Sequence, residues 1–216
     1  VTGAFTTEPF TWGALMVSSW TLTIPESGIA TLTVTTTGRD VVTATAAVVP
    51  AARDTDDHLL HSGGASLSTG AYVAPGATSL ATAATAVAGV RSMTISVDNN
   101  LVSPPGWGSA VSRPIPGAAP TVTGTLNVDF VTGGPFVSAF LNRTDLTLLA
   151  TLAAVENGDE LVQIAIPSLR VTGEIPKAGA PTDMQQLSLP FTAMRAVTDP
   201  SDDLIVVVNR TYDTTI

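Results

Sequence analysis

The chain lacks cysteine entirely, contains a single lysine, and has charged side chains at only 12% of its 216 positions. Without cysteine it can form no disulfide framework, no zinc–thiolate site and no thiol nucleophile. Nine lysine and arginine residues stand against eighteen acidic residues, and a net charge of −9 disfavours wrapping DNA by phosphate neutralisation. No apolar run approaches the roughly 18 residues of a membrane-spanning helix. These absences argue against most enzymes.

Threonine, valine and alanine fill the positions that charges leave open, and the chain contains 33 threonines. This composition favours strands over helices, because β-branched side chains fit a pleated surface. The low charge and a mean hydropathy of +0.36 exclude a disordered chain. The sequence starts at Val1 without an initiator methionine or signal peptide. We therefore expect a processed or incomplete chain, lacking N-terminal residues.

Period-two alternation of apolar and polar residues is the main structural signal along the chain. In Arg91–Val97, for example, Met93, Ile95 and Val97 share one face and hydroxyl residues share the other. The strands predicted from such patterns are Val17–Ile24, Ile29–Thr35, Arg91–Val97, Val122–Phe130, Leu146–Val155, Leu161–Ile166, Leu169–Ile175, Leu187–Phe191 and Leu204–Asn209.

Turn and helix signals organise these strands. A break at Pro25–Gly28 predicts a hairpin, and Asn157-Gly158 is the strongest short hairpin signal, since a type I′ turn needs positive φ at both central residues. Pro135–Asn142 is the one predicted helix, with Phe136, Phe140 and Leu141 on one face. The almost wholly apolar Leu204–Asn209 is predicted to be buried.

Two stretches are predicted as long loops or arms. Residues 50–90 are rich in alanine, threonine, serine and glycine, hold few large apolar anchors, and are expected to contain one weak strand. Residues 103–120 are rich in proline and glycine.

The segment Val17–Ile24 aligns with Val90–Val97, which leaves open a duplicated domain or the chance similarity of any two strands. The architecture expected is one all-β domain over residues 1–216, a β-sandwich with a short flanking helix.

Candidate catalytic groups are few. The chain has no G-x-S-x-G, no glycine-rich phosphate loop and no H-E-x-x-H. Its two histidines, His58 and His61, follow Asp54, Asp56 and Asp57, so either a divalent-metal site or a solvated loop tip is compatible with the spacing. The loop tip fits better, because no glycine turn shapes a metal loop. We predict no catalytic, cofactor or metal site, and no cofactor.

Two further groups of residues have plainer structural explanations. The carboxylate pairs Asp159–Glu160 and Asp202–Asp203 fall at turns, where aspartate bonds its own backbone. Trp12, Trp20 and Trp107 are spread along the chain, which favours packing over a ligand platform. Neither group predicts a reaction.

The polar strand faces are rich in hydroxyls, with acids in excess: Asp98, Asp129 and Glu174 against Arg91 and Arg170. A sheet that is apolar on one side and polar on the other faces water. Such sheets joined edge to edge in a ring would form a closed barrel with a wet, negative lumen, and closure would remove their exposed edges. The chain is therefore expected to assemble.

The order of segments resembles the tail tube (major tail) proteins of long-tailed bacteriophages, of the siphovirus type. The likeness covers most of the chain, and each motif is loose. The segments that carry it are Phe5, Trp12-Gly13, the Trp20 hairpin ending at Gly38, Ser92–Leu101 with its "VDN", Pro114–Gly117, Val122–Phe130 with its "VTGTLN", Ile164–Gly173, Leu187–Ala193 and Leu204–Asn209.

The resemblance implies a structural virion protein without catalysis, forming rings of six subunits, or three where the domain is duplicated. Stacked rings would make a tube whose acidic lumen conducts DNA into the host, with loops and arms clamping neighbouring rings. The implied partners are further copies of the chain, the tape measure, terminator and distal tail proteins, and DNA in transit, without membrane insertion. Asp98, Asp129 and Glu174 are the candidate lumen residues. A capsid decoration protein or surface adhesin is the alternative.

Overall fold

A computed structural model gives the fold of residues 10–13, 15–38, 40–43, 59–76, 79–104, 114–129, 135–154, 160–173, 186–195 and 203–210. The chain divides into two compact units. Unit 1 comprises Val1–Trp20, Val34–Asp57 and Asp98–Pro120, and unit 2 comprises Thr21–Thr33, His58–Val97 and Thr121–Ile216. That residues 1–216 act as one domain stays a prediction.

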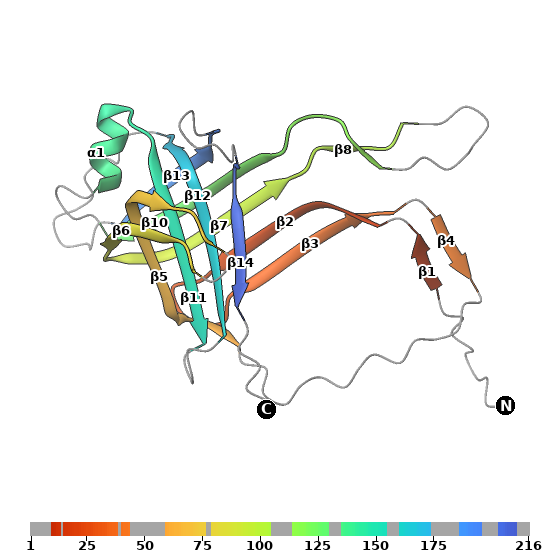
Figure 1. Ribbon diagram of the computed structural model, residues 1–216, viewed down its shortest axis with the longest axis horizontal. Helices are drawn as coiled ribbons and strands as arrows, with labels where there is room; N and C mark the ends of the chain where they lie inside the picture. Colours follow the sequence, from red (N-terminus) through yellow and green to blue (C-terminus); the bar gives the residue numbers. More distant parts are fainter. Residues whose placement is uncertain are drawn as a thin grey trace. The chain divides into compact units, whose positions relative to one another are not determined.

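Strands dominate the described residues, and one short helix accompanies them there (Figure 1). The elements are β1 (Phe10–Gly13), β2 (Met16–Ile24), β3 (Thr31–Thr37), β4 (Asp40–Thr43), β5 (Leu60–Val73), β6 (Thr82–Val87), β7 (Val90–Asp98), β8 (Leu101–Val102), β9 (Ile115–Pro116), β10 (Thr121–Asp129), α1 (Pro135–Asn142), β11 (Leu146–Ala154), β12 (Leu161–Val171), β13 (Gln186–Ala193) and β14 (Val206–Arg210). The predicted all-β sandwich class is confirmed.

One large sheet holds ten of these strands, in the order β3-β2-β7-β10-β13-β12-β11-β5-β6, with β14 paired to β12. Its core face follows from period-two alternation. On β13, every second residue from Leu187 to Ala193 is buried. On β7, Met93, Ile95 and Val97 are buried, as the sequence predicts. The largest fully buried side chains include Ile95, Leu126, Leu148, Leu152, Ile166 and Leu169.

Strand β12 corrects a prediction, because Leu161–Ile166 and Leu169–Ile175 are not separate strands. One strand runs from Leu161 to Val171 through Pro167. Its partner on one side changes there: β14 pairs with Leu161–Ala165, and β13 pairs with Leu169–Val171. A proline has no N–H to donate to a neighbouring strand. It is therefore tolerated at a position that is paired with neither of the neighbouring strands.

The interpretation of residues 50–90 as a loop with one weak strand is wrong where the structure describes them. They supply β5, which pairs with β11, and β6, which pairs with β5. Small residues let β5 run through Gly63-Gly64, and its Leu67 and Thr69 are buried. The Thr69 hydroxyl donates to the Thr147 carbonyl oxygen at 2.6 Å. Periodicity missed this strand because cross-strand pairing substitutes for large apolar side chains.

Backbone bonds also join β5 to the turn between β2 and β3. Ala30 N–H donates to the Leu60 carbonyl oxygen, and Ser62 N–H donates to that of Gly28, each at 2.9 Å. The strands that this turn joins, β2 and β3, lie at one end of the strand order, and β5 lies next to the other end. The sheet of unit 2 therefore folds back on itself and encloses the core.

Two predictions about individual elements are partly wrong. Helix α1 has the predicted bounds and buries Phe136 and Ala139, but Leu141 is 62% exposed. Strand β14 is not buried, because among the described strands it pairs with β12 alone and leaves Val207 53% exposed. Within the described ranges, no helix is long and apolar enough to span a membrane.

Unit 1 contains two short ladders in its described part. Strand β1 pairs with β4, and β8 pairs with β9, both antiparallel. The second ladder places Ile115 opposite Val102. Part of the predicted loop 103–120 is therefore a two-residue strand, and residues 105–113 lie outside the described residues.

Gly124 marks the tightest packing between β10 and β13. It stands opposite Phe191 in the register, and a Cβ at this position would overlap the Phe191 ring and the Thr94 carbonyl oxygen. We expect Gly124→Ala to lower the free energy of unfolding by about 1–3 kcal/mol, as overpacking does. Chemical denaturation measures it. Thr123→Ser, at the neighbouring exposed position, is the control, and an equally stable Gly124→Ala variant would contradict this packing.

Candidate functional site

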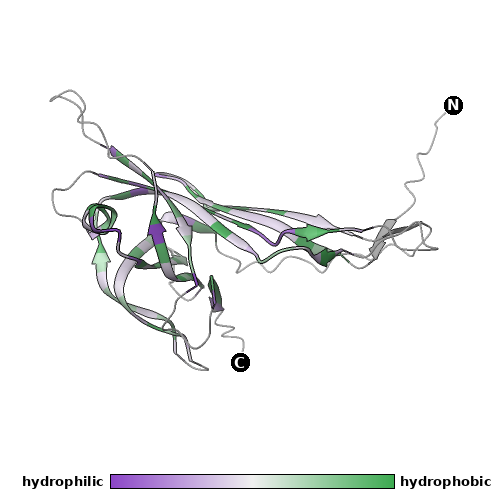
Figure 2. Ribbon diagram, turned by 90° about the horizontal axis from the view of Figure 1, so that it is seen from above, coloured by the Kyte–Doolittle hydropathy of each residue, from purple (hydrophilic) through white to green (hydrophobic). Residues whose placement is uncertain are grey.

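The side of the sheet opposite the core is covered by hydroxyl and amide side chains. We call this the hydroxyl face and define it within unit 2, on β2, β7, β10 and β13. Its members are partly or fully exposed: Thr21, Thr23, Ser92, Thr94, Ser96, Thr123, Thr125, Asn127, Ser188 and Thr192. Long pale stretches along the strands in Figure 2 show this intermediate hydropathy.

Side chains of the hydroxyl face bond to one another across strands. The Thr21 and Ser96 hydroxyl oxygens lie 3.0 Å apart, which joins β2 to β7. The Asn127 amide donates to the Ser92 hydroxyl at 2.8 Å, which joins β7 to β10. Such cross-strand pairs stabilise a sheet and satisfy donors without using charge. The face is therefore polar and nearly neutral.

Charged residues are scarce on the five adjacent strands β3, β2, β7, β10 and β13. Their sequences contain three, namely Arg91, Asp98 and Asp129. Arg91 is the one cation among them.

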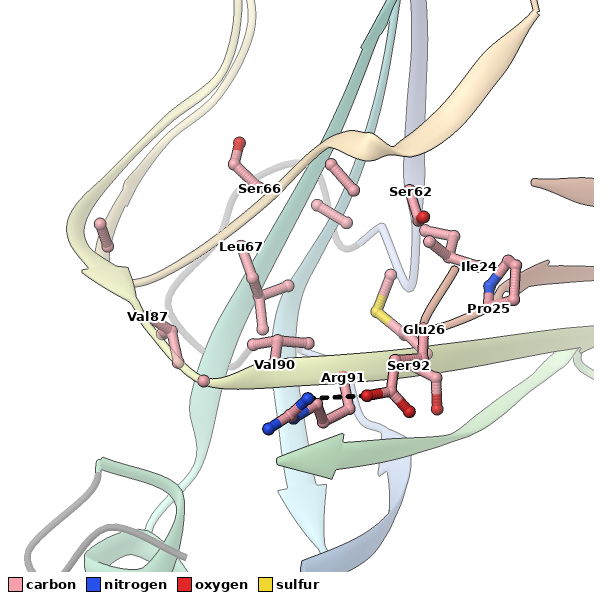
Figure 3. Close-up of a pocket in the computed structure, with 15 residues that line it drawn as sticks. Ile24, Pro25, Glu26, Ser62, Ser66, Leu67, Val87, Val90, Arg91 and Ser92 are labelled. Carbon is pink, nitrogen blue, oxygen red and sulfur yellow. Dashed lines mark hydrogen bonds and ion pairs between the residues drawn. The ribbon is translucent and has the colours of Figure 1, made fainter. Parts of the chain in front are cut away.

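Two carboxylates bind the Arg91 side chain. Its Nη1 lies 2.7 Å from Glu26 Oε1, and its Nε lies 2.8 Å from Asp129 Oδ1. Figure 3 shows Glu26 reaching Arg91 from the turn after β2. The side chains are 31% exposed for Arg91, 56% for Glu26 and 24% for Asp129. The hydrogen bonds that Arg91 donates to Asp129 and Glu26 raise the pKa of Arg91 above its ordinary value. The guanidinium stays charged and is held by two anions.

A cavity of about 340 Å³ adjoins this ion-paired group. Its wall is mainly apolar or small, with Ile24, Leu67 and Met93 among the lining residues, and Glu26 and Arg91 contribute charge. Nothing in the sequence predicts the cavity or the role of Glu26. A lone arginine on five neighbouring strands was the available signal, but its partner Glu26 lies 65 residues away in the chain.

Asp98 has a local structural role in unit 1. Its Oδ1 accepts the Asn100 N–H at 2.8 Å, and Asn100 has a φ of 48°. The Asn100 amide donates to the Ala119 carbonyl oxygen at 2.6 Å, and the Asn99 amide donates to that of Val17 at 2.9 Å. Aspartate and asparagine suit such a turn because their side chains bond the nearby backbone. The "VDNN" motif thus fixes the end of β7.

The candidate lumen residues do not form one described cluster. Asp98 belongs to unit 1, Asp129 belongs to unit 2, and Glu174 lies outside the described residues. The lumen assignment stays a prediction.

The other sequence candidates are only partly described. His61 Nδ1 accepts the Gly63 N–H at 2.9 Å, while His58, Asp54, Asp56 and Asp57 lie outside the described residues. In the part of the chain that the structure covers, no three His, Asp or Glu side chains are grouped to hold a metal ion. Trp20 is half-buried. The remaining candidates whose side chains are not described are Trp12, Trp107, Asp159 and Asp202.

The turn at Asn100 gives a local test. Replacing Asn100 with alanine removes the bond to Ala119 and puts at positive φ a residue less suited to it than asparagine, with an expected cost of about 1–2 kcal/mol. We expect the Gly117 amide, which donates to the Asn100 carbonyl oxygen, to exchange its hydrogen about tenfold faster. The variant Asn100→Gly tolerates the positive φ but loses the side-chain bond. Its exchange rate should therefore fall between those of the native chain and the alanine variant. Unchanged exchange in both variants would refute this role.

Comparison with known proteins identifies the family of the chain. The sequence profile described as "Phage tail tube protein" matches residues 2–193. None of the curated proteins compared with the chain matches it. The matched range includes the strands of the large sheet except β14. The chain therefore belongs to the phage tail tube protein family, a family of structural proteins of the virion tail.

Proposed function

We propose that this chain is the repeating subunit of a siphovirus-type tail tube, in which stacked rings enclose a channel for DNA and the hydroxyl face lines that channel. The observation that carries the proposal is the run of five adjacent strands with three charged residues. Family membership supports the tubular role.

A channel for DNA must be wet and must not bind phosphate. Hydroxyl groups hydrate the wall, while lysine or arginine would release counterions from DNA and hold it. The acids Asp98, Asp129 and Glu174 are proposed to line the channel and add weak repulsion. The net charge of −9 acts in the same direction at longer range.

Assembly into rings is supported by the edges of the large sheet. Strand β6 ends the strand order and β3 begins it, and neither contains a charged residue. Monomeric β-proteins commonly protect such edges with charge or proline. On β3, Leu32 is 60% exposed. The proposed occupants of these edges are further copies of the chain, in rings of six or three.

The partners proposed beyond self-assembly follow from the same role. The tube would meet tape measure, terminator and distal tail proteins at its ends or interior, and DNA would pass without stable binding. No cofactor or membrane insertion is part of the proposal.

Negative-stain electron microscopy over a concentration series tests the assembly. We expect hollow tubes or stacked rings as the protein concentration rises, and their end views give the symmetry. Monodisperse monomers at the highest concentration would contradict the proposal.

A lysine on the exposed edge should block assembly. Leu32→Lys introduces a charge on β3 at little cost to the fold, because the side chain is already exposed. We expect the variant to stay folded by circular dichroism and to form no tubes. Leu141→Lys, a similarly exposed leucine on α1, is the matched control and should assemble normally. Tubes from Leu32→Lys would show that β3 is not an assembly edge.

A further inference from the structure

We propose that Gln163 is a positioning residue for strand β6, and that it fixes the register in which this edge strand is presented to the next copy of the chain. The second half of this inference, pairing between copies along β6, rests on the proposed function. The first half, the register of β6 within one copy, does not depend on that function and is measured separately.

The side-chain amide of Gln163 binds the backbone of Ala81, the residue before β6. Ala81 N–H donates to Gln163 Oε1 at 3.0 Å, and Gln163 Nε2 donates to the Ala81 carbonyl oxygen at 3.3 Å. Nε2 also donates to the Thr151 hydroxyl at 3.1 Å. Gln163 is 5% exposed and Ala81 is 3% exposed. Because an amide side chain offers both a donor and an acceptor, Gln163 serves Ala81 as a residue of a neighbouring strand would.

This contact joins the start of β6 to a strand that is not its neighbour in the sheet. Gln163 belongs to β12, and the strand order places β11 and β5 between β12 and β6. Ala81 shares a buried cluster with Leu149 of β11 and Ala165 of β12. Ile164 alternates with these β12 residues, so it faces the other way, and it is buried too. The chain before β6 therefore covers one face of β12, and Gln163 is the polar group at that contact.

Strand β6 has few other contacts that fix its position. Of its six residues, Ala83 and Val87 are half-buried and the other four are exposed. Its pairing with β5 is interrupted between Thr69 and Tyr72, and Gly70 within the interruption has a φ of 98°. Strands that are polar or small on both faces specify their register weakly. A buried polar side chain with a single set of partners supplies that specificity.

The register of β6 decides which of its backbone groups are available to a further strand. Along an edge strand, successive residues direct their N–H and C=O groups alternately toward the paired neighbour and away from it. A shift of β6 by one residue would exchange these two sets and would reverse its faces. A closed ring repeats one contact between copies, so every subunit must present β6 in the same register.

Cross-linking measures the register within one copy, because the chain contains no cysteine of its own. Val73 of β5 stands opposite Thr82 of β6. The pair Val73→Cys with Thr82→Cys places thiols at opposite positions, and Val73→Cys with Ala84→Cys offsets them by two residues. Each pair is treated with dibromobimane, which bridges neighbouring thiols, in the native background and with Gln163→Met. Methionine keeps an unbranched side chain and removes the bonds to Ala81.

We expect the opposite thiols of the native background to be bridged at least about tenfold faster than the offset thiols, since only they are direct neighbours. Gln163→Met should reduce this preference to about threefold or less. Thr147→Val, which removes a partly buried bond from the Thr147 hydroxyl to the Pro167 carbonyl oxygen, is the matched control and should keep the preference. An unchanged preference with Gln163→Met would overturn the inference.

Electron microscopy of the same variants, without the added cysteines, tests the effect on assembly. We expect Gln163→Met to stay folded by circular dichroism and to need at least about tenfold more protein to form tubes, because the bonds that hold the start of β6 are lost. Thr147→Val should assemble at the native concentration. If Gln163→Met does not fold, Gln163→Asn carries both measurements, because its shorter side chain withdraws the amide from Ala81.

The two halves of the inference fail in different ways. Tubes that form at the native concentration although the cross-linking preference is lost would show that copies do not pair along β6. Failure of the native chain to form tubes would refute the proposed function and the pairing between copies. In that case the cross-linking result still decides whether Gln163 sets the register of β6.

Discussion

Burial of one face of the large antiparallel sheet is the constraint on which the other features depend. Side chains alternate across a strand, so burying Ile95, Leu126 and Leu189 sends their neighbours to the opposite face. A register shift of one residue would reverse both faces. The contact of Gly124 with Phe191 shows how closely β10 and β13 approach under this constraint, since no β-carbon fits between them.

The opposite face acquires its character as a consequence. It is covered by threonine, serine and asparagine, several of which satisfy one another across strands, as Thr21 and Ser96 do. Hydroxyls make this face wettable without a fixed charge. The strands β3, β2, β7, β10 and β13 contain three charged residues, and Glu26 and Asp129 hold the one cation among them, Arg91. Such a surface suits a family whose members belong to the phage tail tube.

The edges of the sheet complete this description. Strands β3 and β6 have no charged residue, and Leu32 is largely exposed. An isolated protein with such edges would risk uncontrolled pairing. For a subunit that assembles with its copies, the same edges provide the hydrogen-bonding groups of an interface, which links the composition of the chain to self-assembly.

The sequence by itself determined the all-β class, the alternating strands β7, β10 and β13, and helix α1, because these depend on local periodicity. It also indicated the family through the order of its motifs. Only the tertiary structure decided that Gly63-Gly64 lies within a long strand, that β12 continues through Pro167, and that Glu26 reaches Arg91. Those outcomes depend on which strands become neighbours, and contacts between residues far apart in the chain leave no periodic signal in it.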